Sequence, residues 1–285
     1  MTGSLEPDSV RDSVLAGSKL WSPVLVVAET GSTNADLIAA ARDGAGEGTV
    51  LVAERQTAGR GRLGRSWLTE PGAALTFSVL LRPTMVPAAA RSWLPLLTGV
   101  AVAAGIREQT GLDVSLKWPN DVVAAGGDGP AGLGKLAGIL AELAGDAVVI
   151  GIGLNVASTP ALGVPAPAGA GVTAGGGATL PPASLASIGA AGVDRAALLT
   201  AILRQLEHWY LRWTADTGPG DAVSSGLRAE YLRSCRTVGR EVRVELPGGT
   251  VLTGRAGDVD DAGRLLVANA DGVVPVSAGD VIHVR

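Results

Sequence analysis

The segment from Gly59 to Arg65 restricts the fold of this chain more than any other stretch. It places three glycines and three arginines within seven positions. Glycine lets the backbone bend closely around a ligand, and arginine supplies a fixed cation with a planar fork of donors that suits carboxylate and phosphate. We therefore interpret these residues, called here the Gly/Arg loop, as a cationic cover for a small anion. A solvated basic turn is the plainer alternative.

The three glycines of this loop also satisfy the spacing of a dinucleotide-binding fingerprint. That fingerprint belongs in a tight turn directly between a strand and a helix. Here the apolar strand expected over residues 49–53 ends six residues before Gly59, and Pro71 follows too soon for a helix to open at Gly64. A dinucleotide-dependent oxidoreductase is accordingly disfavoured.

Length, charge and cysteine count exclude several classes of protein. The 285 residues suffice for one large domain with or without a small one, and a net charge of -4 argues against nucleic-acid binding through bulk charge. The single cysteine, Cys235, excludes internal disulfides and a four-thiol zinc site and fits a reducing cytoplasm. We find no secretory signal and no charge-free window of eighteen apolar residues, so we expect no membrane span.

Apolar periodicity predicts one large domain of mixed strands and helices over residues 23–235. Residues 1–22 are interpreted as a short extension with one brief helix near 10–20, too short for a helix-turn-helix DNA-binding domain. Residues 157–192 are rich in Ala, Gly and Pro, which predicts a largely irregular insert. Strands are expected at 25–28, 49–53, 75–81, 114–118, 121–124, 135–143 and 147–156, a Gly-rich hairpin tip at 125–134, and helices at 35–42, 93–110, 194–213 and 221–235.

The pattern changes after Gly239 to short alternating strands separated by turn residues. About fifty residues of this kind, 236–285, predict a small β-barrel. We interpret the barrel as a stability module or docking surface without chemistry of its own.

Polar groups gather at an expected helix start and at an expected strand turn. Gly31–Asn34 offers hydroxyls and an amide at a helix N-terminus, where a polar group or an anion can bind, although a plain helix cap uses the same residue types. In Lys117–Asp121, Pro119 fixes a turn between two apolar strands and leaves a lysine, an asparagine and an aspartate together. A purely structural turn has less use for the lysine and tryptophan that precede the proline.

The next two expected strands carry single polar residues in an apolar setting. Period-two alternation puts Lys135 on one face with every second residue up to Leu143, and that face is otherwise small and apolar. We expect this face to point inward, where a lysine needs an anion near it; a lysine that reaches solvent at the strand end is the alternative. Gly151–Val156 ends the following strand with glycines and Asn155, which suits close approach of a flat ligand.

Taken together and in order, five motifs of this chain resemble the biotin protein ligase family: Ser32–Asn34, Gly59–Arg65, Lys117–Asp121, Gly134–Leu140 and Gly151–Val156. The resemblance spans residues 29–155, and the strand-rich C-terminal segment continues it. It implies an α+β fold, with a central mixed β-sheet backed by helices of the class II synthetase type over 23–235 and an SH3-like β-barrel over 236–285. It also implies ATP-dependent activation of biotin as biotinyl-AMP and transfer to a lysine of a biotin carboxyl carrier protein domain, with an acyl-CoA carboxylase subunit as the expected acceptor.

The resemblance implies roles for individual residues as well. Lys135, Arg62 and Asp121 are the expected catalytic residues. Mg²⁺ is expected to accompany the triphosphate, and Asp121 organises either that metal or the cationic cluster. The expected contacts of biotin are Ser32, Thr33, Asn34, Gln56, Arg60, Gly61, Arg62 and Lys135, and those of the nucleotide are Arg62, Arg65, Trp67, Lys117, Asn120 and Asn155.

Two rival functions remain open at this stage. A lipoate– or octanoate–protein ligase has a related fold and also activates its acid as an adenylate, but the Gly/Arg loop and Lys117–Asp121 favour biotin. A non-catalytic biotin-binding or transcriptional protein is the other rival, and the retained arginines and Lys135 argue against it. We expect a monofunctional cytoplasmic enzyme with no nucleic-acid or membrane partner.

Overall fold

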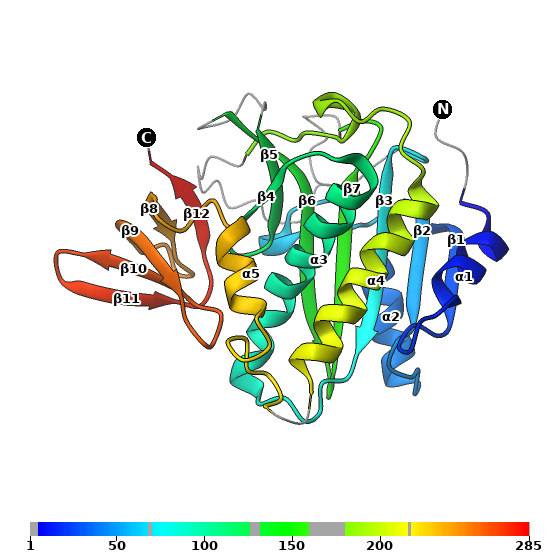
Figure 1. Cartoon of the computed structure of the whole chain (residues 1–285), viewed down its shortest axis with the longest axis horizontal. Coiled ribbons are helices and arrows are strands. Elements are labelled where there is room, and N and C mark those ends of the chain that lie inside the picture. The colour runs from blue at the N-terminus through cyan, green and yellow to red at the C-terminus, as the bar shows by residue number, and fades with distance from the viewer. Residues whose placement is uncertain (1–4, 68–69, 126–131, 160–179, 216–217, 285) are drawn as a thin grey trace.

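A mixed seven-stranded sheet forms the centre of the molecule, which is described here from a computed structural model covering residues 5–67, 70–125, 132–159, 180–215 and 218–284 (Figure 1). The strand order is β1-β2-β3-β7-β6-β5-β4; β1 runs parallel to β2, and the other neighbouring pairs are antiparallel. This confirms the expected mixed sheet. The strands are β1 (Val24–Thr30), β2 (Val50–Gln56), β3 (Ala74–Leu81), β4 (Val114–Lys117), β5 (Asp121–Ala125), β6 (Leu133–Ala144) and β7 (Ala147–Asn155).

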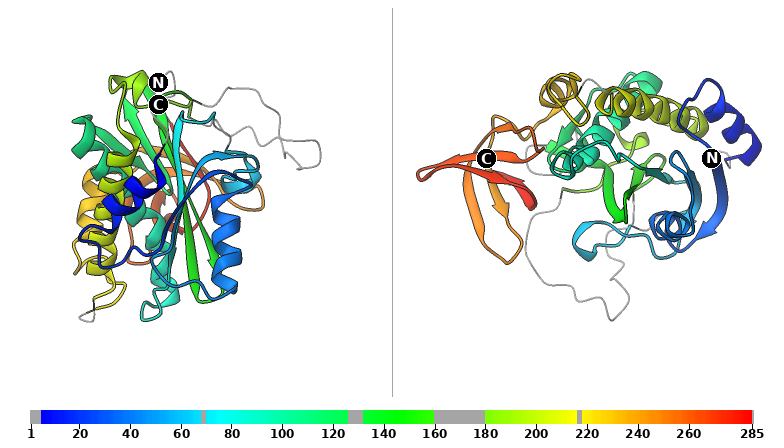
Figure 2. Two further views of the ribbon diagram at one scale, coloured as in Figure 1. Left: turned by 90° about the vertical axis from the view of Figure 1, so that its right-hand side faces the viewer. Right: turned by 90° about the horizontal axis from the view of Figure 1, so that it is seen from below.

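Helices cover both faces of this sheet, unequally. The long helices α3 (Trp93–Thr110) and α4 (Arg195–Trp213) lie on one face with α1 (Pro7–Leu15) and α5 (Leu227–Ser234), whereas α2 (Thr33–Arg42) lies on the other (Figure 2). The main core lies beneath α3 and α4, and a small second cluster that includes Leu37, Leu80 and Val149 lies beneath α2. The face that α2 covers only in part is the one left available for a ligand.

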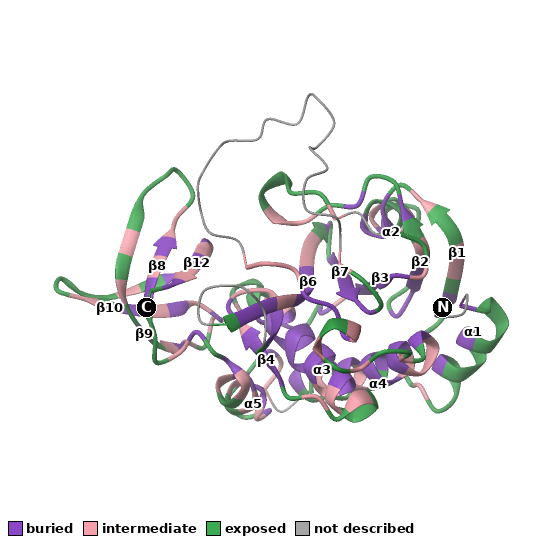
Figure 3. Cartoon of the chain, turned by 90° about the horizontal axis from the view of Figure 1, so that it is seen from above, coloured by how far each residue is buried: buried purple, intermediate pink, exposed green. Residues whose placement is uncertain are grey.

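Helix α3 lies at the centre of the main core. Residues Ala88–Thr110 are long and apolar enough to cross a membrane by length and composition, and 67% of an apolar 18-residue window within them is buried in the protein. Figure 3 shows α3 enclosed by its neighbours. Small residues allow the close approach of α4, since a Cβ added at Gly105 would lie 2.6 Å from Cγ1 of Ile202. Packing between the sheet and α4 therefore accounts for the apolar composition of this helix.

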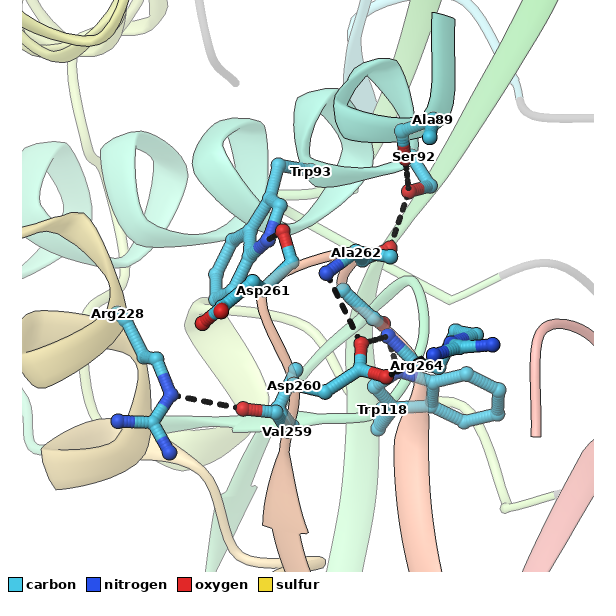
Figure 4. A network of polar contacts seen from close by, with 11 residues as sticks. Ala89, Ser92, Trp93, Trp118, Arg228, Val259, Asp260, Asp261, Ala262 and Arg264 are labelled. Atoms are coloured by element: carbon cyan, nitrogen blue, oxygen red, sulfur yellow. Dashed lines mark hydrogen bonds and ion pairs between the residues drawn. The ribbon is translucent and has the colours of Figure 1, made fainter. Parts of the chain in front are cut away.

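The C-terminal residues form a separate five-stranded antiparallel sheet of order β11-β10-β9-β8-β12. This agrees with the expected small barrel, and its polar turns also make contact with the large domain. The turn between β9 and β10 approaches α3, where Trp93 Nε1 donates to the carbonyl of Asp261 at 2.8 Å and Ser92 contacts the carbonyl of Ala262 (Figure 4). The strands are β8 (Glu241–Glu245), β9 (Val251–Val259), β10 (Leu265–Asn269), β11 (Gly272–Val276) and β12 (Asp280–His283).

Local sequence signals set several element ends as expected. Gly111 adopts φ 70° and ends α3 at Thr110, and the Asp194 side chain accepts from the amides of Ala196 and Ala197 at the start of α4. Ser32 caps α2 by accepting from the amide of Ala35. These three helices therefore begin and end within a residue or two of their predicted positions.

Two helices differ from their predictions. The first helix is α1, Pro7–Leu15, not a helix over 10–20, because proline at the first helical position favours an earlier start. The helix expected over 221–235 is shortened to α5, because Gly226 takes φ 78° and separates it from the preceding turn.

The expected irregular insert, residues 157–192, is only partly within the described residues, as is the hairpin tip at 125–134. Of the insert, residues 180–192 pack against the large domain. Leu185 is fully buried, Pro182 forms a β-bridge with Lys135, and Ala186–Ile188 forms a short 3-10 helix. The C-terminal end of the insert is thus part of the wall behind β6.

The prediction that β6 alternates regularly from Lys135 to Leu143 is wrong. The register of β6 against β5 shifts opposite Val122 and Val123, where a β-bulge inserts one residue. Lys135 therefore shares a face with Gly138, and an added Cβ at Gly138 would lie 3.2 Å from Nζ of Lys135. Leu143 is 71% exposed. Bulges commonly re-aim a side chain beside a functional site, and this one turns Lys135 toward the face that α2 covers.

Candidate functional site

A cavity of about 280 Å³ lies on that face of the sheet and collects residues from both domains. All predicted site residues except Asn155 line it, and they come from α2, the end of β2, the Gly/Arg loop, the β4–β5 turn and β6. Its lining includes Ser32, Thr33, Asn34, Gln56, Arg60, Gly61, Arg62, Arg65, Trp67, Lys117, Asn120, Asp121 and Lys135.

One end of the cavity is a prearranged polar wall at the start of α2. Gln56 Oε1 accepts from the Thr33 amide at 2.8 Å and lies 3.1 Å from the Thr33 hydroxyl. The hydroxyl of Ser78 lies 2.7 Å from Thr33 Oγ1 and 2.6 Å from Asn34 Oδ1. These side chains are buried and hold one another in place, so the wall can present fixed donors and acceptors to a small polar ring.

Asn34 belongs more to this wall than to the cavity space. Its Nδ2 donates to Glu142 Oε2 at 2.7 Å and to the carbonyl of Leu140 at 3.2 Å, which ties α2 to β6. Gly151 makes this approach possible, because an added Cβ there would overlap the Asn34 amide. The sequence did not identify Ser78 or Glu142, since neither belongs to a motif.

A partly buried ion pair lines the cavity. Lys135 Nζ lies 2.6 Å from Asp121 Oδ1, and the two side chains are 24% and 14% exposed. Burial by itself raises the pKa of Asp121, but Lys135, Lys117 and Arg62 together hold that pKa below its ordinary value. Asp121 is therefore an ionised carboxylate among cations.

Two further cations complete this cluster. Arg62 Nη1 donates to Asn120 Oδ1 at 2.9 Å, and Asn120 Nδ2 donates to the carbonyl of Ile139 at 3.0 Å. Burial lowers the pKa of Arg62, and Asp280 and Asp121 counter that shift. Burial likewise lowers the pKa of Lys117, which Asp121 partly offsets. Positive groups gathered in a partly desolvated cavity favour an anionic ligand.

The Gly/Arg loop folds back on itself over this cluster. The Gly61 amide donates to the carbonyl of Arg65 at 2.7 Å, and the Trp67 amide donates to that of Gly59 at 2.8 Å. Leu63 at its tip adopts φ 55° and is 70% exposed. A left-handed conformation is costly for leucine, so this tip is a place where the loop can change its conformation.

Trp67 covers the floor of the cavity. Gly138 of β6 and Gly153 of β7 are paired across the sheet, and an added Cβ at Gly153 would overlap the Trp67 indole. The two glycines thus let an aromatic ring lie directly on the strands. Among the described residues the buried indole N–H of Trp67 has no hydrogen-bond partner.

Asn155 is the predicted site residue that does not line the cavity. It is 1% exposed, and its Nδ2 donates to the carbonyl of Ala183 at 2.9 Å and to that of Lys135 at 3.4 Å. Asn155 therefore holds the end of β7 against the backbone of Lys135 and the end of the insert. In this position Asn155 supports the backbone beside the cavity, and the nucleotide contact that we expected stays a prediction.

The barrel contributes to the site, contrary to the interpretation that it has no chemical part. Residues Asp280, Val281 and Ile282 of β12 line the cavity, and Asp280 forms an ion pair with Arg65. Only the packing of the barrel on the large domain brings these residues to the cavity. Within the described residues, no group of three or more His, Cys, Asp or Glu side chains could hold a metal ion.

Comparisons with known proteins agree with this geometry. Residues 33–155 match the model of the biotin/lipoate A/B protein ligase family, and residues 237–284 match that of the biotin protein ligase C-terminal domain. A biotin–[acetyl-CoA-carboxylase] ligase of Mycobacterium tuberculosis is 42% identical over 99% of this chain and 96% of its own length. Another of Paracoccus denitrificans is 30% identical over 90% and 98%. A solved biotin protein ligase from Aquifex aeolicus, in complex with biotin and ATP, has a TM-score of 0.70 at 27% identity and covers 93% of this chain and 100% of its own.

Proposed function

This chain belongs to the biotin protein ligase family, and we propose that it activates biotin with ATP as biotinyl-AMP and transfers the biotinyl group to a lysine of a biotin carboxyl carrier protein. The observation that carries the proposal is the meeting of Arg62, Lys117 and Lys135 in one cavity beside a prearranged polar wall. The acceptor we propose is the carrier domain of an acetyl-CoA carboxylase, as named for the Mycobacterium relative. We place the activity in the cytoplasm, where ATP and a free Cys235 are both expected.

The first step must bring two anions together. An oxygen of the biotin carboxylate attacks the α-phosphorus of ATP, the bond from that phosphorus to the bridging oxygen breaks, and pyrophosphate leaves. At about 4 Å and an effective dielectric near 20, each pair of negative charges repels by about 4 kcal/mol. Lys135 and Arg62 offset this repulsion at the carboxylate and the α-phosphate. Their positions are fixed before the substrates arrive, so little reorganisation is needed.

The two substrates are assigned to different residues of the cavity. Ser32, Thr33 and Gln56 contact the polar ring of biotin, and the Asn34 amide keeps that wall in place. The nucleotide lies toward Trp67, with its phosphates near Arg65, Lys117 and the Gly/Arg loop amides. Concave sets of backbone amides are well suited to phosphate oxygens.

Asp121 orients the cations and does not bind the metal. Its carboxylate is already paired with Lys135 and lies in the field of Lys117 and Arg62, which disfavours a divalent cation at the same atom. Mg²⁺ commonly binds through phosphate oxygens and water with one or two carboxylates. We therefore propose that it enters with ATP as the substrate MgATP.

The second step is attack by the amine of the acceptor lysine on the acyl carbon of the mixed anhydride. The new C–N bond forms, the C–O bond to AMP breaks, and the amine loses a proton. Water would attack the same carbon, so the intermediate must be covered until the carrier arrives. The Gly/Arg loop, with its strained tip at Leu63, is the element that opens for ligands and closes over the intermediate.

Mass spectrometry of a carrier domain tests this proposal. The chain is incubated with biotin, MgATP and an acetyl-CoA carboxylase carrier domain, and the expected result is a gain of one biotinyl group. Parallel reactions omit ATP, replace the acceptor lysine with arginine, or supply lipoate or octanoate in place of biotin. Modification by lipoate or octanoate with none by biotin would assign the chain to the related ligase, and no modification by any acid would overturn the proposal.

A further inference from the structure

A series of buried hydrogen bonds connects the barrel to the turn between β4 and β5. Trp118 lies in that turn between Lys117 and Pro119, and its amide donates to Thr237 Oγ1 at 3.0 Å. Thr237 Oγ1 in turn lies 3.2 Å from Nε2 of His283, the last residue of β12. Thr237 is fully buried and His283 is 8% exposed. Three segments that are far apart in the sequence thus share one polar contact.

The direction of these two hydrogen bonds follows from the donors that each residue offers. The Trp118 amide can only donate, so the Thr237 oxygen accepts from it. Among the described residues, the Thr237 hydroxyl has no hydrogen-bond partner other than Trp118 and His283. A neutral His283 ring with an unprotonated Nε2 accepts this proton and so satisfies both groups, whereas the other tautomer would leave the hydroxyl proton without an acceptor.

The same turn is attached to the barrel side at two more points. The Arg236 amide donates to the carbonyl of Leu116 at 2.8 Å, and Trp118 Nε1 donates to the carbonyl of Gly263 at 3.1 Å. Trp118 is 1% exposed, so its indole is enclosed where the two domains meet (Figure 4). The turn that carries Lys117 and Asp121 therefore takes its position from the barrel as well as from its own hairpin.

On the basis of the proposed function, we propose that His283 is a positioning residue for adenylate formation, acting through Thr237 on the backbone of Trp118. That backbone lies between Lys117, which lines the cavity, and the residues that hold Asp121 against Lys135. Catalysis by prearranged charges is sensitive to small displacements of the charged groups. Loss of the Thr237–His283 contact thus changes the first chemical step although neither residue lines the cavity.

A cycle of variants tests this role. Thr237→Val removes the hydroxyl with nearly the same shape, His283→Phe removes the acceptor, and His283→Gln keeps an acceptor near the position of Nε2. We expect each of the first two, and their combination, to lower kcat for biotinyl-AMP formation by about tenfold, the usual effect of one lost hydrogen bond. The double variant loses no more than Thr237→Val alone, because that variant already removes both the Trp118–Thr237 and the Thr237–His283 contacts. His283→Gln recovers most of the rate.

The binding constant for biotin is the readout that separates positioning from loss of folding. The polar wall of Thr33 and Gln56 lies at the other end of the cavity, so biotin affinity stays within about twofold of the wild-type value in all variants that fold. His208→Phe, at an exposed histidine of α4, is the matched control and keeps the wild-type rate. If His283→Phe does not fold, Thr237→Val decides by itself.

Several results would overturn the inference. They are a wild-type rate in Thr237→Val, additive losses in the double variant, no recovery with His283→Gln, or a lowered melting temperature without a change in kcat. An inactive wild-type chain would instead contradict the proposed function, so the two failures are distinguishable.

Discussion

Arg65 of the Gly/Arg loop forms an ion pair with Asp280 of β12, which lies 215 positions later in the chain. Asp280 also acts electrostatically on Arg62 and Lys117, where it favours the charged form of each. The carboxylate of the barrel thus neutralises part of the cationic cluster and holds the C-terminal half of the loop. The proposed closure of the loop is therefore linked to docking of the barrel through this pair.

Replacing Asp280 with asparagine should weaken the closed loop. The pair is partly exposed, so its contribution is of the order found for surface pairs, and we expect biotinyl-AMP to leave the enzyme about two- to fivefold faster. The difference from wild type should shrink as salt is raised. Release can be followed after rapid removal of free ligand, with Asp271→Asn, at an exposed barrel turn, as the control. Equal release rates at low salt would show that the pair does not hold the loop.

Replacing Lys135 with glutamine should lower adenylate formation by roughly 10²- to 10³-fold, the usual effect of removing one prearranged charge from a reacting oxygen. It should also destabilise the fold, because Asp121 is left as a buried charge with one partner fewer. The measurement is single-turnover formation of biotinyl-AMP, beside thermal unfolding. Lys19→Gln, at an exposed lysine, is the matched control.

The double variant Lys135→Gln with Asp121→Asn separates these two effects. Neutralising both partners should restore much of the lost melting temperature, since no unpaired carboxylate remains. It should not restore the rate, because the cation is still absent. Recovery of the rate along with the stability would contradict the catalytic role of Lys135.

Much of this site could be predicted from the sequence because its residues lie in compact local motifs. Three residues at the start of α2, the Gly/Arg loop and the Lys117–Asp121 turn each indicate a binding chemistry through residue types at short spacing, and the structure brings all three segments to one cavity. Helix ends were predictable for the same reason, since Gly111 ends α3 and Asp194 caps α4 through residues next to them in the sequence.

What could not be predicted depends on contacts between distant segments. Asp280 resembles an ordinary acidic residue at a barrel turn until the barrel is placed against the Gly/Arg loop. The bulge that re-aims Lys135 exists only in the pairing of β6 with β5, so simple alternation wrongly placed Lys135 on the face of Ala137 and Ile139, which belong to the main core. Asn155 follows a glycine-rich strand as a ligand contact would, but its Nδ2 donates to the backbone carbonyls of Lys135 and Ala183.

Replacing Gly153 with alanine should affect nucleotide binding more than folding. The added methyl group would overlap the Trp67 indole, which lies just beyond the Gly/Arg loop and not in the sheet. We expect weaker ATP binding by about tenfold or more, with a melting temperature that changes little, because the strain is relieved by displacement of one side chain. Gly46→Ala, where an added Cβ meets nothing within 4 Å, is the control. A large loss of melting temperature with normal ATP affinity would show that Trp67 is fixed and does not serve the nucleotide.

The stability of the protein should depend on pH through His283. Burial, then the nearby cations Lys117 and Arg240, lower the pKa of His283 to about 4, whereas the ordinary value of an unfolded chain is about 6.5. Between these two pH values the unfolded chain binds a proton at His283 that the folded protein does not bind. The stability that comes from a neutral, buried His283 is therefore fully present above pH 6.5 and is lost as pH falls toward 4. Wild type and His283→Gln, which cannot titrate, are compared by thermal unfolding from pH 7.5 to 4.5. We expect wild type to lose more of its melting temperature than the variant over this range, and parallel curves would mean that His283 titrates alike in the folded and unfolded states.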